Sequence, residues 1–185
     1  MKHLRMTHAF CCTLLALSIP AVSAVVQTSQ KETLLKHWKT SGEFTLAVAN
    51  AMPADGYTFR PTPGEMSFGE VMAHIAVANR GACAAASGLT APALPPKIAE
   101  WAKDGEKAEV DKDTATHYLE ESFAFCSTAI SGMPESRMNT IVGTPSRHLT
   151  GSEYLWSYFT HTAHHRGQAE VYLRLKGVKP PDYEF

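Results

Sequence analysis

Glycine and proline divide this chain into four long segments, each with apolar residues at the spacing of an α-helix. The segments cover residues 29–51, 68–88, 114–131 and 152–176. Apolar residues three and four positions apart line one face of a helix, and such faces must be buried against one another. No stretch between the segments alternates long enough to predict a β-strand. The sequence therefore predicts an all-α domain, a four-helix bundle.

Local signals mark the expected ends of these helices. Two capping boxes, in which a hydroxyl and a carboxylate three residues later satisfy free backbone groups, are expected at Ser67–Glu70 and Thr150–Glu153. The glycines expected to end helices are Gly88, Gly132 and Gly177.

The two middle helices are separated by a long connection. Residues 89–96 contain three prolines and cannot form a regular element, and a short helix is expected around 98–103. The third long helix is expected to start through Asp111 or Asp113. The bundle should therefore have a long crossover, and residues 135–148 form a second, irregular connection.

The first 24 residues have the pattern of a secretory signal peptide. Lys2 and Arg5 precede an apolar stretch over residues 9–19, and Val22-Ser23-Ala24 supplies the small residues before a cleavage site. We expect a periplasmic or secreted protein with a single domain over residues 25–185. No apolar run reaches the ~20 residues of a membrane-spanning helix, so no stable membrane anchor is expected.

After cleavage, 161 residues would carry 15 basic and 18 acidic side chains, a net charge of −3 with neutral histidines. This charge disfavours a nucleic acid as partner. Cys83 and Cys126 are the cysteines left. An oxidising compartment would permit a disulfide between them, but the sequence favours two separate buried thiols on different helices.

Histidines in the last helix carry the chemical signal. His161 and His165 stand one turn apart on the same helical face, so both could reach one metal ion. The side chain of His164 points ~100° away from that of His165. Thr162 occupies the position where the helix of a zinc protease requires a glutamate. A third ligand must come from another helix, and His74 is the best candidate.

Other interpretations stay open at this point. By spacing alone, His74 is more readily explained as a core histidine than as a ligand. Cys83 lies nine residues further along the same helix and faces the opposite way. His37 is interpreted as a surface or supporting residue rather than a ligand.

Several residues of the last helix have two interpretations. Tyr158 and Tyr172 could line a pocket on the histidine face, although packing is the favoured role. Arg166 and Gln168 could orient neighbouring groups or pair between helices.

Two sequence blocks resemble the DinB-like proteins. The first is Met66–His74 (MSFGEVMAH), preceded by FRPTPG, and the second is His161–Gln168 (HTAHHRGQ), followed by YLR and a double proline. This resemblance covers most of the mature chain. It implies a four-helix bundle in which His74, His161 and His165 bind a divalent metal.

Such a site suggests two kinds of function. Three neutral imidazoles leave an ion with its full charge and with open positions, which suits catalysis by an activated water or thiolate. Zinc, nickel and iron all fit this nitrogen-rich ligand set. The first hypothesis is a metal-dependent hydrolase or a thiol-dependent transferase, acting on a small-molecule substrate or thiol. The alternative is a non-catalytic binding or structural metalloprotein. A homodimer is compatible with either, although no apolar stripe indicates one.

Overall fold

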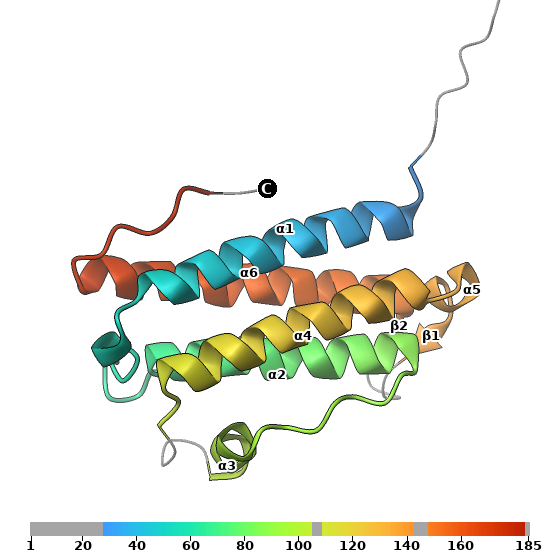
Figure 1. Ribbon diagram of the computed structural model, residues 1–185. Helices are drawn as coiled ribbons and strands as arrows, with labels where there is room; N and C mark the ends of the chain where they lie inside the picture. Colours follow the sequence, from blue (N-terminus) through green and yellow to red (C-terminus); the bar gives the residue numbers. More distant parts are fainter. Residues whose placement is uncertain (1–27, 105–108, 143–147, 184–185) are drawn as a thin grey trace, which may run out of the picture.

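The computed structural model describes residues 28–104, 109–142 and 148–183 (Figure 1). The predicted signal peptide, residues 1–24, lies outside these residues. The long helices are α1 (Gln30–Ala51), α2 (Phe68–Ser87), α4 (Lys112–Gly132) and α6 (Gly151–Leu175). The smaller elements are η1 (Ala54–Gly56), α3 (Pro96–Asp104), α5 (Glu135–Met138), β1 (Ile141–Val142) and β2 (Leu149–Thr150). The predicted all-α, four-helix-bundle class is confirmed.

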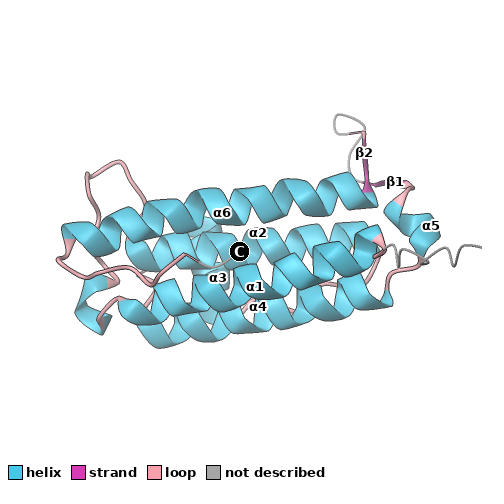
Figure 2. Ribbon diagram, turned by 90° about the horizontal axis from the view of Figure 1, so that it is seen from above, coloured by secondary structure: helices cyan, strands magenta, loops and turns pink. Residues whose placement is uncertain are grey.

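The helix directions explain the long crossover. Helices α2 and α4 run the same way along the bundle, and α1 and α6 run the other way (Figure 1). Each of α1 and α2 packs against both α4 and α6. Since α2 and α4 are parallel neighbours, the chain must return along the bundle between them, and it does so through a segment that contains α3. Viewed from above, the long helices lie side by side with β1 and β2 at one end (Figure 2).

The helix starts follow from the capping residues. Both predicted capping boxes are present, and a third opens α1. Their pairs are Ser29–Glu32, Ser67–Glu70 and Thr150–Glu153. Of the two candidate caps for α4, it is Asp111 that accepts a hydrogen bond from the backbone amide of Thr114, at 2.9 Å. Helix α2 ends as predicted at Gly88, whose φ of 81° is a conformation that glycine adopts easily.

Two local predictions need correction. The expectation of no strand is wrong, because β1 and β2 form an antiparallel pair in which Ile141 lies opposite Thr150 and Val142 opposite Leu149. The connection over residues 135–148 also contains helix α5. Elements of two and four residues are too short to leave a periodic pattern in the sequence.

Cys83 of α2 and Cys126 of α4 form a disulfide, with their Cα atoms 5.2 Å apart. The prediction of two separate thiols is therefore wrong. Both cysteines are fully buried, and they meet because α2 and α4 are neighbours throughout the bundle. Within the described residues, none of the helices has both the length and the apolar character needed to cross a lipid bilayer.

Gly69, in the first turn of α2, allows the crossover to lie against the bundle. A β-carbon on Gly69 would collide with the backbone carbonyl oxygen of Val110. We expect Gly69→Ala to lower the free energy of unfolding by ~2–3 kcal/mol, because the backbone at Val110 must move. Urea unfolding measures this change in the free energy of unfolding. The matched control is Gly81→Ala on the same helix, where nothing lies within 4 Å and where alanine should stabilise by ~0.5 kcal/mol. Equal effects at the two positions would refute the close-contact explanation.

Candidate metal centre

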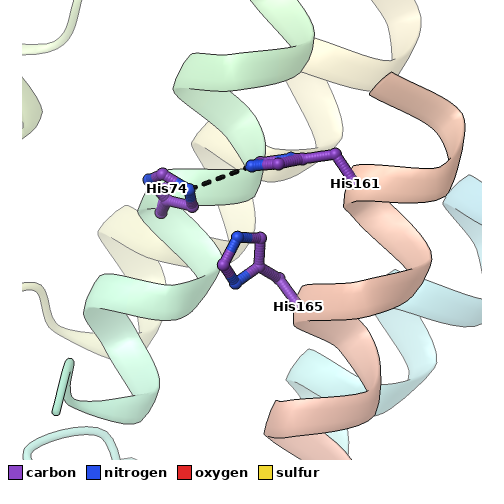
Figure 3. A group of neighbouring side chains, drawn as sticks. All are labelled: His74, His161 and His165. Atoms are coloured by element: carbon purple, nitrogen blue, oxygen red, sulfur yellow. Dashed lines mark hydrogen bonds between the residues drawn. The ribbon is translucent and has the colours of Figure 1, made fainter. Parts of the chain in front are cut away.

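Three histidine side chains converge between helices α2 and α6 (Figure 3). One ring nitrogen of each of His74, His161 and His165 lies within 4.8 Å of the others. The Nε2 atoms of His74 and His161 are 3.1 Å apart. The ring centroid of His165 is 4.5 Å from that of His74 and 4.4 Å from that of His161. The structure thus brings together the three residues singled out in the sequence, while their role as ligands stays a prediction.

The helical repeat and the packing of α2 against α6 account for this geometry. His161 and His165 are one turn apart, so both project from α6 toward α2. His74 projects from α2 toward them. Next to this cluster, Thr162 donates a hydrogen bond at 2.9 Å to the side-chain oxygen of Asn79. This buried bond fixes the position of α6 relative to α2.

The environment keeps the three imidazoles neutral. Burial, followed by the charges of His165, His74 and His164, lowers the pKa of His161 to about 4. Burial also lowers the pKa of His74 and of His165, although the hydrogen bond that His165 donates to Gln168 partly opposes the shift at His165. A neutral imidazole retains a lone pair on one ring nitrogen, which a metal ion requires.

Gln168 selects the nitrogen that His165 presents to the cluster. The side-chain oxygen of Gln168 lies 2.6 Å from Nδ1 of His165 and accepts a hydrogen bond from its N–H, which leaves the lone pair on Nε2. Three convergent neutral nitrogens match the donor chemistry of zinc, nickel and iron sites. The residues therefore fit a divalent ion.

A cavity of about 470 Å³ lies beside the cluster and is open to solvent. Its described lining residues are His74, Ala78, Leu149, Ser157, Tyr158 and His161. Tyr158 therefore lines a pocket, and it also has the favoured packing role, since it packs against the hydrophobic core. Tyr172 does have the predicted packing role, since it is buried and donates a hydrogen bond at 3.1 Å to the carbonyl oxygen of Met66. Leu149 and Ser157 were missed because no local pattern distinguishes them.

The other residues considered lie outside the cluster. His164 is exposed, and Cys83 is in the disulfide. His37 lies on α1, where its ring is near those of Trp156 and Phe159. Arg166 pairs helices, because it donates hydrogen bonds from α6 to α1. Among the described residues, the three histidines are the one group of potential ligands at this place.

Gln168 offers a direct test of the second coordination sphere. We expect Gln168→Ala to weaken zinc binding by ~10–100-fold, because the ring of His165 loses the group that orients it. Competition with a chromophoric chelator measures the affinity. Gln168→Glu keeps an acceptor at the same place and should bind zinc at least as tightly as the unchanged protein. Unaltered affinity in Gln168→Ala would show that the contact has no role in metal binding.

Comparison with known proteins identifies the family. The model of the DinB superfamily matches residues 37–169, which contain all three histidines. No curated protein sequence matches the chain.

Solved structures show the same fold. A DinB-like protein from Bacillus cereus is 21% identical, with a TM-score of 0.68 over 82% of this chain and 96% of that one. A DinB-like protein from Bacillus subtilis is 20% identical, with a TM-score of 0.62 over 82% and 97%. A protein assigned to the DinB family from Exiguobacterium sibiricum is 20% identical, with a TM-score of 0.59 over 85% and 97%. Since the family model spans most of the chain and these bundles superpose on it, the chain belongs to the DinB superfamily.

Proposed function

We propose that this protein is an exported metalloenzyme whose divalent ion is held by His74, His161 and His165. The observation that carries the proposal is that these three neutral imidazoles converge at the wall of an open cavity of about 470 Å³. Structural zinc is normally closed off by four protein ligands, whereas catalytic zinc keeps a position open. Three ligands beside an open cavity fit the catalytic pattern.

The chain's own groups define what could enter this cavity. Ala78 and Leu149 supply an apolar wall, while Ser157 and Tyr158 supply hydroxyl groups that could orient a substrate. Neither lysine, arginine nor a carboxylate is among the described lining residues, so the bound ion itself would supply the charge of the cavity. When bound, a divalent ion would supply activation of water or stabilisation of a thiolate. The chemistry is thus that of a hydrolase or a thiol-dependent transferase.

Export is supported by two independent features. The first is the signal-peptide pattern of residues 1–24. The second is the disulfide between Cys83 and Cys126, since disulfides persist mainly in oxidising compartments. N-terminal sequencing of the exported protein should begin at Val25, and a mature protein that retains Met1 would contradict cleavage.

Elemental analysis of natively purified protein, followed by cobalt substitution, tests the metal proposal. We expect one divalent ion per chain and a change in the visible spectrum of the cobalt form when a small thiol is added, because the thiolate takes an open position. Thiols and simple esters are then screened for turnover. A protein that binds neither zinc, nickel nor iron would refute the site. A bound ion whose spectrum no thiol changes would favour the structural alternative.

A further inference from the structure

A buried arginine of α6 contacts α1, whereas the histidines of the same helix face α2. Only 6% of the surface of Arg166 is exposed. Its Nη1 donates hydrogen bonds to the hydroxyl of Ser41 at 2.9 Å, the carbonyl of Ser41 at 3.3 Å and the hydroxyl of Thr45 at 3.3 Å. Its guanidinium carbon is 4.4 Å from the ring centroid of Phe44. All of these partners are uncharged.

The charge of Arg166 is not matched by a contacting carboxylate in the described part of the chain. The nearest acid on its own helix is Glu170, one turn further along, and Glu170 forms its ion pair with Arg174, at 3.8 Å. Removing a charge from water is costly unless an opposite charge contacts it. Moreover, a guanidinium has five N–H donors, and the described hydrogen bonds of Arg166 use Nη1 alone.

A small cavity adjoins this guanidinium. Its volume is about 50 Å³, and Arg166, His37, Thr40 and Ser41 supply polar groups to its lining. Phe159, Ala163 and Tyr183 supply apolar and aromatic walls. Since one water occupies ~30 Å³ of liquid, this space holds about two waters, which is roughly the size of one planar group of three heavy atoms. A carboxylate has that size, and its two oxygens match the planar fork of a guanidinium.

We propose that the cavity between α1 and α6 is a second binding site, which takes a carboxylate group against Arg166. The site is separate from the metal centre, because adjacent residues of a helix, here His165 and Arg166, point ~100° apart. The hydroxyl group of Ser41 can donate a further hydrogen bond to the carboxylate, whereas that of Thr40 donates to the carbonyl oxygen of Lys36 at 3.3 Å. The ring of Phe159 and the methyl group of Ala163 exclude water. The ligand is a small carboxylic acid, or a larger molecule that inserts its carboxylate end.

Formate is the probe, because it is the smallest carboxylate. Thermal unfolding of the metal-loaded protein is followed as formate replaces gluconate at constant ionic strength, since gluconate is too large for the cavity. We expect a saturable rise of several degrees in the unfolding midpoint. Arg166→Gln removes the charge and should abolish the rise. Ala163→Leu fills the cavity while keeping Arg166, and it should also abolish the rise even if Arg166→Gln fails to fold.

Matched controls complete the test. Ala124→Leu adds the same side chain at an exposed position of α4 and should respond to formate as the unchanged protein does. A rise that persists in Ala163→Leu, or no rise in the unchanged protein, would overturn the proposal.

A further variant tests whether the carboxylate belongs to this chain. Glu184, which lies outside the described residues, is replaced in Glu184→Gln. If formate stabilises only that variant, the carboxylate comes from the chain itself, and the proposal of an external ligand fails.

Discussion

Replacing His161 with alanine is expected to abolish stoichiometric binding of a divalent ion and to leave the bundle folded. His161 contributes one of three convergent nitrogens, and its Nε2 lies 3.1 Å from that of His74. Since loss of a group that merely orients a ligand costs ~10–100-fold in affinity, loss of a ligand itself should cost more than ~100-fold. The fold should survive, because the hydrogen bond of His161 is made with His74 inside the same cluster, and its Nδ1 is buried without a hydrogen-bond partner.

The same helix supplies the matched control for this experiment. His164 is exposed and adjacent to the cluster, with its ring centroid 4.8 Å from that of His165. His164→Ala should therefore retain one ion per chain, as measured by elemental analysis after dialysis, whereas His74→Ala and His165→Ala should lose it. Full occupancy in His161→Ala would show that the ligand assignment is wrong. Equal loss in His164→Ala would indicate nonspecific binding to a histidine-rich surface.

The helices and their caps could be predicted because the signals that determine them are local. Ser67 with Glu70, and Thr150 with Glu153, satisfy backbone groups within one turn of their own positions. The pairing of His161 with His165 is local in the same way. Their meeting with His74 is not, because it depends on α6 packing against α2 across 87 residues of sequence. The assignment of His74 to the same site as His161 and His165 therefore rested on the resemblance to a family rather than on helical spacing.

Features that depend on helix packing could not be predicted. Tyr158 lines the cavity beside the histidines, but its position in the sequence is equally compatible with a packing role. Leu149 reaches the same cavity from β2, a strand of two residues with no sequence signature. The disulfide could be predicted only in part. The long crossover implies that the two helices carrying the cysteines run in parallel, but it does not specify which faces of those helices are in contact.

The disulfide is expected to make one of the largest single contributions to the stability of the bundle. Cys83 and Cys126 are 43 residues apart, so their bond closes a loop that includes the whole crossover. Closing such a loop lowers the entropy of the unfolded chain by an amount worth about 4 kcal/mol at 25 °C. The variant Cys83→Ala/Cys126→Ala should therefore unfold at a urea concentration lower by about 2 M.

A reductant provides the control that separates the bond from the altered side chains. Both cysteines are fully buried, so the folded protein should resist reduction, whereas protein reduced while unfolded should refold with the stability of the double variant. The double variant itself should unfold at the same urea concentration with and without reductant. A reductant effect in the variant would show that the loss arises elsewhere. If the oxidised protein and the variant share one midpoint, the crossover is held by packing alone.

Because α2 carries His74 and packs against both α4 and α6, loosening the crossover should also weaken the metal centre. A lower zinc affinity of the double variant would reveal this effect.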